Sequence, residues 1–245
     1  MTPTDPLSPN RDAPRVSDRA TRFDVVAACR VLHESHLSNT VWGLVAVRDS
    51  DGGGIWVTRE GVGFSEVGDD DVVAVCLDGT ARRGSPEADA ETELALAILA
   101  RRPEVTAVVR CHSLYATAFS VTGRSLHAIS HEGCHLVAPD QAAWRREAPG
   151  RAGGWALDVA EALTGSQYLL LAGHGLVTVG ATLGEAVALA NYVEKAARLQ
   201  LLAGDELHLV SPAEVEAKRL GQLNRPRLSW DYLRRRAFEV SGTAS

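Results

Sequence analysis

The sequence of 245 residues is poor in lysine and has no long apolar run. Lys195 and Lys218 are its only lysines, and Lys195 lies off the apolar face of its expected helix, where we expect it to face water. Schiff-base catalysis needs a desolvated lysine, so this reaction class is disfavoured. No apolar segment approaches the ~18 residues that a membrane-spanning helix requires, and a membrane is therefore not an expected partner.

Signatures of several cofactor and nucleophile sites are also absent. There is no GxxxxGK[ST] phosphate loop and no GxSxG elbow, and GVGFSE (61–66) lacks the third glycine of a dinucleotide fingerprint. The four cysteines form no CxxC pair, and residues 1–22 contain no apolar core of an export signal. We therefore expect a cytoplasmic protein with free thiols, in which residues 1–22 form a disordered tail.

What is present is the composition of an ordinary globular protein. Hydrophobic residues make up 45% and charged residues 23%, and 25 basic against 31 acidic residues give a net charge of −6. Nucleic-acid-binding surfaces carry a clustered basic excess, so nucleic acid is not an expected partner. The length suits one mid-sized domain, which we place at residues 23–240.

Strand and helix patterns alternate through this domain. Strand-like runs are expected at 41–48, 54–59, 72–79, 105–112 and 167–180, the last broken at Gly173-His174-Gly175. Helices are expected at 24–36, 87–102, 154–165, 183–203, 212–222 and 226–238, with a further short one after residue 112. This order predicts a single α/β domain of interleaved strands and helices.

Three separated stretches supply side chains that suit a metal or acid–base site. Arg110 and His112 project to the same face of their strand because side chains alternate. His174 lies between two glycines at a strand break, and Glu91 lies on the helix upstream. Two histidines and a carboxylate are the minimum for a Zn²⁺ or Fe²⁺ site with open positions. Lone histidines near apolar strands are more often hydrogen-bonded core or surface residues, so spacing alone does not show whether these residues bind a metal.

A longer pattern resembles a known family. ETELALAILARRPEV (91–105), VVRCHSLYATAFS (108–120), LLLAGHGLVTVGATLGEA (169–186) and the following YVEKA resemble the class II aldolase/adducin family over roughly residues 23–205. SHEGC (130–134) and WDYLRRR (230–236) further resemble a branch associated with bacterial secondary metabolism. The resemblance implies a three-layer α/β domain with a central, mostly antiparallel sheet flanked by helices. It also implies a homotetramer with the site between subunits.

The resemblance implies roles for individual residues. Members of the family hold a divalent metal with an H-x-H pair on this strand and a third histidine before the last strand, and they use a glutamate as acid/base or ligand. Here His112, His174 and Glu91 match three of these positions. Arg110 stands where the first strand histidine is expected, and a guanidinium has no lone pair for a metal. A three-histidine site is therefore impossible at these positions.

The family's aldolases also use a tyrosine of a neighbouring subunit as proton donor. Counting along the chain places Glu132 at that position, with His131 beside it. The resemblance then implies that Glu132 or His131 takes over the acid–base role, and Glu132 needs a raised pKa to act as an acid. For His131, a hydrogen-bonded turn is the alternative.

The phosphate loops of the family's sugar-phosphate aldolases are altered. GLVA (43–46) and TREG (58–61) stand where these enzymes have GN-x-S and TPSG-like segments. Leucine and alanine supply no side-chain donor, and Glu60 repels phosphate. A phosphorylated sugar is thus disfavoured, while Arg59 is either an anion ligand or a solvated hairpin residue.

Three functions remain open. The favoured one is a metal-dependent lyase that cleaves a non-phosphorylated, carboxylate-bearing hydroxy- or oxo-acid, with Zn²⁺ or Fe²⁺ on Glu91, His112 and His174 and with Arg110 clamping the substrate carboxylate. The same ligand set is compatible with an iron oxygenase acting on an aromatic acid side chain. In the third, Arg110 takes the place of the cation and pairs with Glu91, which leaves a metal-free catalyst or a non-catalytic, adducin-like binding protein.

Overall fold

The structure, a computed structural model, describes residues 16–38, 40–82, 88, 91–136, 144 and 154–242. Its strands are β1 (Gly43–Arg48), β2 (Gly54–Thr58), β3 (Val72–Cys76), β4 (Ala107–Cys111), β5 (Tyr168–Leu171) and β6 (Gly175–Gly180). Its helices are α1 (Val16–Glu34), α2 (Thr92–Arg101), α3 (Leu114–Ser120), α4 (Trp155–Ala162), α5 (Leu183–Ala203), α6 (Pro212–Gly221) and α7 (Arg225–Gly242). Two 3₁₀ turns are η1 (Asp69–Asp71) and η2 (Glu132–His135). None of the helices in the described ranges has the length and apolar character needed to cross a membrane.

The six strands form one sheet in the order β3-β2-β1-β4-β6-β5, and every neighbouring pair is antiparallel. The expected central antiparallel sheet is therefore confirmed. Strand β4 lies at its centre, and in this register Arg110 of β4 is flanked by Leu44 of β1 and Val177 of β6.

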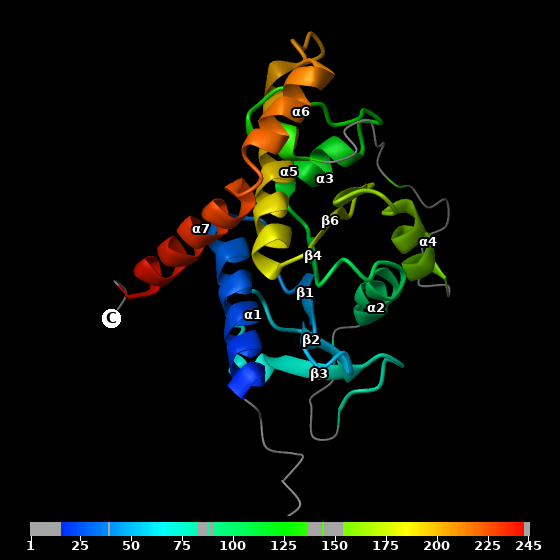
Figure 1. Ribbon diagram of the computed structural model, residues 1–245, viewed down its shortest axis with the longest axis vertical. Coiled ribbons are helices and arrows are strands. Elements are labelled where there is room, and N and C mark those ends of the chain that lie inside the picture. Colours follow the sequence, from blue (N-terminus) through cyan, green and yellow to red (C-terminus); the bar gives the residue numbers. More distant parts are fainter. Residues whose placement is uncertain are drawn as a thin grey trace, which may run out of the picture.

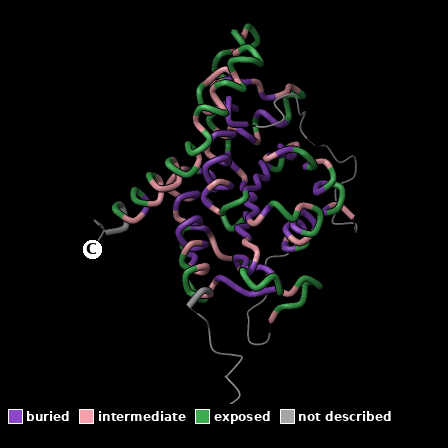
Figure 2. Tube along the Cα trace, viewed as in Figure 1, coloured by how far each residue is buried: buried purple, intermediate pink, exposed green. Residues whose placement is uncertain are grey.

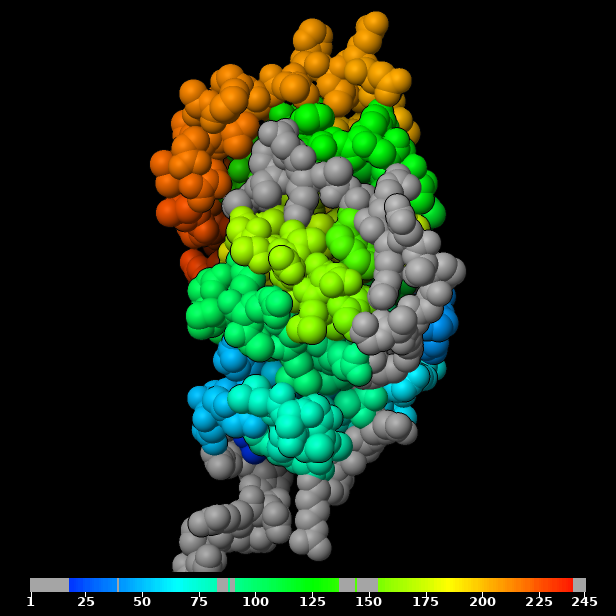
Figure 3. All heavy atoms as spheres, turned by 90° about the vertical axis from the view of Figure 1, so that its right-hand side faces the viewer, coloured from blue at the N-terminus to red at the C-terminus, as the bar shows by residue number. Residues whose placement is uncertain are grey.

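Helices cover both faces of the sheet and make a three-layer domain. Helices α1, α3, α5 and α7 pack on one face, and α2 and α4 pack on the other, as Figure 1 shows. Buried residues fill both interfaces (Figure 2), and Figure 3 shows the side of the molecule that carries α4. Val109 and Cys111 of β4 face the first core and Val108 faces the second, so Arg110 lies on the α2 side, opposite Cys111 as expected.

The first helix differs most from expectation, because α1 begins at Val16 rather than at Asp24. Part of the expected tail is therefore helical, and residues 1–15 lie outside the described residues. Tertiary contacts explain the extension. The guanidinium of Arg22 lies 4.9 Å from the ring centroid of Trp56, and Phe23 stacks on Phe238 with 5.6 Å between ring centroids.

Candidate functional site at one end of the central strands

Three neighbouring strands bring the predicted residues to one end of the sheet. Cys111, the last residue of β4, pairs with the first residue of β1 on one side and with Leu176 of β6 on the other. His112 follows β4, Trp42 precedes β1 and His174 precedes β6. Because these strands are antiparallel neighbours, the three aromatic side chains belong to the same end of the sheet.

Strand β6 begins with a glycine because the backbone of the neighbouring strand leaves no room for a side chain at position 175. Its φ is +81°, and a Cβ on it would lie 2.1 Å from the carbonyl oxygen of Cys111 and 2.8 Å from the Cα of His112. Neither backbone atom can move out of the way, so only glycine fits here. The backbone of the 173–175 turn therefore passes directly against His112.

Arg110 and Glu91 form a buried ion pair. Nη1 of Arg110 lies 2.6 Å from Oε2 of Glu91, and the two side chains are 5% and 15% exposed. Glu91 occupies the N-cap position of α2 and so precedes the helix, whereas we expected it within the helix. Two charges buried this closely neutralise each other, and removing either one is costly.

The same guanidinium contacts His112. Nη2 of Arg110 lies 3.2 Å from Nε2 of His112. An arginine only donates, so Nε2 accepts and we assign the ring proton to Nδ1. Burial, the charge of Arg110 and the charge of His174 lower the pKa of His112 to about 4, although the Trp42 backbone opposes the shift. His112 is therefore neutral at pH 7.

These contacts do not fit the divalent metal that the family pattern implies. Arg110 contacts both the carboxylate of Glu91 and Nε2 of His112, which are two of the three expected ligands. The guanidinium stays protonated, so a divalent cation at these groups would meet a like charge at close range. Over the described ranges, no group of three or more His, Cys, Asp or Glu side chains is arranged to hold a metal ion.

His174 lies within electrostatic reach of His112, since its charge contributes to the lowered pKa of that residue. Its side chain is exposed. The turn that carries it is anchored to α3, because the backbone N–H of Gly173 donates to Oγ of Ser120 at 2.9 Å. Glu91, Arg110, His112 and His174 are thus brought to one region, as the sequence predicted.

Glu132 and His131 lie in or beside η2 and contact other groups. Nζ of Lys195 lies 2.5 Å from Oε1 of Glu132, so the lysine expected to face water is half-exposed and paired. Burial raises the pKa of the Glu132 carboxyl, but the hydrogen bond from Lys195, a backbone hydrogen bond and nearby positive charge outweigh it, so the net pKa is lowered. The raised pKa that an acid role requires is not found, and Glu132 is ionised at neutral pH.

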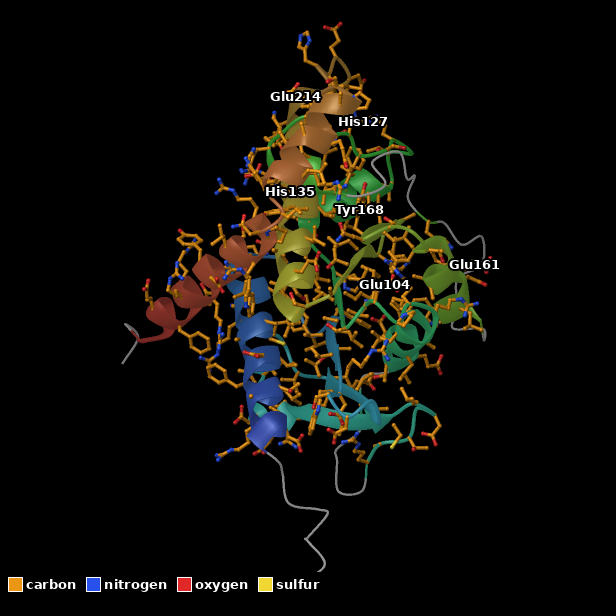
Figure 4. All side chains as sticks on the ribbon, viewed as in Figure 1. Glu104, His127, His135, Glu161, Tyr168 and Glu214 are labelled. Carbon is orange, nitrogen blue, oxygen red and sulfur yellow. The ribbon has the colours of Figure 1, made fainter. Side chains whose placement is uncertain are left out.

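His131 belongs to an aromatic cluster. Its ring centroid is 6.0 Å from that of His135, which in turn is 5.8 Å from that of Tyr192 on α5. The hydroxyl of Tyr192 is 2.6 Å from Oγ of Ser229 on α7. In Figure 4, His135 lies beside the upper half of α5. His131 itself is exposed, and its carbonyl oxygen accepts a hydrogen bond from the N–H of Cys134 in the η2 turn.

Two residues of this region were not among the predicted site residues. Glu194 of α5 accepts hydrogen bonds from the backbone N–H groups of Tyr115 at 2.9 Å and Ala116 at 2.8 Å, which caps α3 directly after His112. Trp42 lies in an edge-to-face arrangement with His112, with 6.4 Å between ring centroids. The only sequence signal for Trp42 was its place before Gly43, which the sheet register sets opposite the end of β4.

The stretches that correspond to phosphate loops offer little to phosphate. Leu44 and Ala46 are fully buried in the core beneath α2 and α4. Nε of Arg59 is paired with Oδ1 of Asp71 at 2.7 Å, so the hairpin arginine is already engaged by a carboxylate. An anion at this hairpin would compete with Asp71.

Comparison with known proteins agrees with the topology. The model of the class II aldolase and adducin N-terminal domain matches residues 23–201. An L-fuculose phosphate aldolase of Methanococcus maripaludis is 27% identical over 179 residues, which cover 73% of this chain and 95% of that protein. A 4-hydroxy-3-prenylphenylpyruvate oxygenase/4-hydroxy-3-prenylbenzoate synthase of Streptomyces roseochromogenus is 33% identical over 138 residues, 53% of this chain and 47% of that protein.

The solved structure of an L-fuculose 1-phosphate aldolase from Glaciozyma antarctica superposes with a TM-score of 0.81 at 24% identity, covering 96% of this chain and 95% of that chain. This likeness extends the agreement in fold to nearly the whole chain. Because the family model also spans most of the domain, including β4 and the His174 turn, the chain belongs to the class II aldolase and adducin family.

Proposed function

We propose that this chain is a metal-independent acid–base lyase that acts on a non-phosphorylated, carboxylate-bearing hydroxy- or oxo-acid. The observation that carries the proposal is the position of Arg110, whose guanidinium contacts both Glu91 and His112. In this arrangement a single fixed positive charge takes the place expected for a divalent cation. It retains part of the electrostatic stabilisation of a metal and none of its Lewis acidity.

Relatives support the reaction class. Several are named as aldolases, which cleave a carbon–carbon bond next to a carbonyl group. In such a cleavage the substrate hydroxyl loses its proton to a base, the carbon–carbon bond breaks, and its electron pair forms an enolate that is later protonated. Arg110 is suited to stabilise the enolate because a guanidinium stays charged at every step.

Glu132 is the group available for the proton transfer. It is ionised at neutral pH and so can act as a base rather than as an acid, whereas Nε2 of the neutral His112 is already engaged by Arg110. We propose that Glu132, with His131 beside it, acts from a neighbouring subunit of a homotetramer, and that Glu91 positions Arg110. His174 would then border the substrate rather than ligate a metal.

The altered phosphate loops support a non-phosphorylated substrate. Leu44 and Ala46 are core residues, and Arg59 is paired with Asp71. A substrate carboxylate at Arg110 would share the guanidinium with Glu91, and we propose that it binds there. The relative named for a phenylpyruvate substrate acts on an oxo-acid of this kind.

The metal-dependent lyase and the iron oxygenase are less well supported. Both require Glu91 and His112 as ligands, and both of these residues contact Arg110. A non-catalytic binding protein keeps the same contacts, so turnover separates it from the proposed lyase.

The test is turnover by chelator-treated protein. A set of 4-hydroxy-2-oxo-acids is incubated with the enzyme in excess EDTA, with L-fuculose 1-phosphate as the phosphorylated comparison, and the carbonyl product is measured. We expect cleavage of an acid in EDTA and its loss in Arg110→Met. Turnover that needs added Zn²⁺, Mn²⁺ or Fe²⁺, cleavage of the sugar phosphate alone, or binding of acids without cleavage would contradict the proposal.

A further inference from the structure

We infer that Trp42 selects substrates that carry an aromatic side chain next to the carboxylate-bearing reactive end. The inference rests on the proposed function, because it names the class of acid that the Arg110 site takes. It concerns a residue that contacts His112 and belongs to none of the ion pairs described above.

Trp42 is an exposed aromatic side chain at the site. It is 58% exposed, although tryptophan is usually among the more buried residue types. Its ring lies 6.4 Å from that of His112 at an interplanar angle of 65°. His112 contacts both the guanidinium of Arg110 and the indole of Trp42, so it joins the two side chains.

The backbone around Trp42 is fixed. Gly43 has a φ of +149°, and a Cβ on it would lie 2.7 Å from Cζ of the buried Phe64. Oγ of Ser38 donates to the carbonyl oxygen of Trp42 at 2.7 Å, and the N–H of Trp42 donates to Oγ1 of Thr40 at 3.3 Å. An indole on a fixed backbone loses little conformational freedom when a flat apolar group packs against it.

The residues around Trp42 divide into a buried charged group and an exposed apolar group. Arg110 is almost fully buried, whereas Val41, Trp42 and Leu114, which follow or face the end of β4, are all exposed. A short acid bound beside His112 would leave the indole in water. An acid with an aryl group would also cover the indole, so the observed arrangement favours an aryl-substituted oxo-acid.

The experiment compares two 2-oxo-acids that differ only in their side chain. Binding of phenylpyruvate and pyruvate is measured by calorimetry for the wild type and for Trp42→Ala, Trp42→Phe and Tyr232→Ala. Tyr232 is the matched control because it is an exposed aromatic residue on α7. An aromatic contact of the usual strength predicts that Trp42→Ala weakens phenylpyruvate about two- to twelve-fold and leaves pyruvate unchanged. Trp42→Phe and Tyr232→Ala should keep most of the preference.

The outcomes separate this inference from the proposed function. If both acids bind the wild type equally, or if Trp42→Ala weakens both to the same degree, the inference is overturned while the acid site stands. If neither acid binds but L-fuculose 1-phosphate does, the proposed function fails and the inference fails with it. If Trp42→Ala changes only the oligomeric state, Trp42 belongs to a subunit contact and the inference is likewise overturned.

Discussion

At the scale of single residues, Arg110 determines what this site can do. Its guanidinium reaches both Glu91 and His112, two of the three residues that the sequence predicted as metal ligands. An arginine here therefore engages two groups that such a metal would need. The contacts of Arg110 lead to two predictions.

Glu91→Gln should destabilise the fold. It removes the carboxylate charge that faces a 5% exposed guanidinium, and breaking a buried pair in this way costs about 3 kcal/mol or more. Glu104→Gln is the matched control, since Glu104 pairs with Arg102 while 63% exposed, and we expect a much smaller change. Urea unfolding of both variants measures the difference. Equal, small losses would show that the Arg110 pair contributes little.

His112 should titrate near pH 4, and Arg110→Met should raise its pKa, because the charge of Arg110 is one cause of the shift. Burial remains, so the pKa should stay below the ordinary value. The folded pKa lies below the unfolded one, so the unfolded state binds the proton more readily. The resulting stability is complete above about pH 6.5 and is lost as pH falls towards 4. NMR titration of the imidazole C–H signals tests this, and a wild-type midpoint near 6.5 would contradict it.

The sequence predicted which residues gather here but not how they contact one another. Alternation along a strand placed Arg110 and His112 on one face, and that holds. Whether Arg110 would clamp a substrate or pair with Glu91 depended on where α2 begins, and Glu91 lies at its N-cap. Likewise Lys195 was expected to face water, because a helix pattern shows nothing of the η2 turn that carries Glu132.

At the scale of elements, the site depends on how closely β6 approaches the end of β4. Gly175 has both a positive φ and backbone atoms in the place of a Cβ. The two effects can be separated, because Gly61 has a φ of +80° and open space around it.

Gly175→Ala should therefore destabilise the protein more than Gly61→Ala does. Gly61→Ala, the control, introduces only the strain of an alanine in a left-handed conformation, about 1 kcal/mol. Gly175→Ala must in addition move β6 away from His112. Thermal unfolding gives the comparison, and displaced backbone amide shifts of His112 and its neighbours give an independent readout. Equal destabilisation of the two variants would mean that the strands can separate without cost.

Helices and strands were predicted best where the apolar pattern that defines them lies within the segment itself. The apolar stripe of α5 and the short apolar strands β5 and β6 were expected close to their observed bounds. The start of α1 was not, because Arg22 and Phe23 are held by contacts with Trp56 and Phe238, which lie far away in the sequence.

At the scale of the whole molecule, three layers bring distant segments to one end of the sheet. The α2 layer supplies Glu91, the central strands supply Arg110 and His112, and α5 reaches both parts of the predicted site. On α5, Glu194 caps α3 next to His112, and the adjacent Lys195 holds Glu132. The fold is that of the family, and this end of the sheet carries the Arg110 guanidinium against Glu91 and His112.

A Zn²⁺ titration of tag-free protein by calorimetry tests this substitution of a guanidinium for a metal. The wild type should bind no stoichiometric Zn²⁺ at this site, whereas Arg110→His, which creates an H-x-H pair beside His174 and Glu91, should gain about one tightly bound ion per chain. Arg110→Met and the double variant Arg110→His/His112→Ala should not gain it. One tightly bound Zn²⁺ per wild-type chain that is lost in His112→Ala would contradict the assignment of Arg110 to the place of the cation.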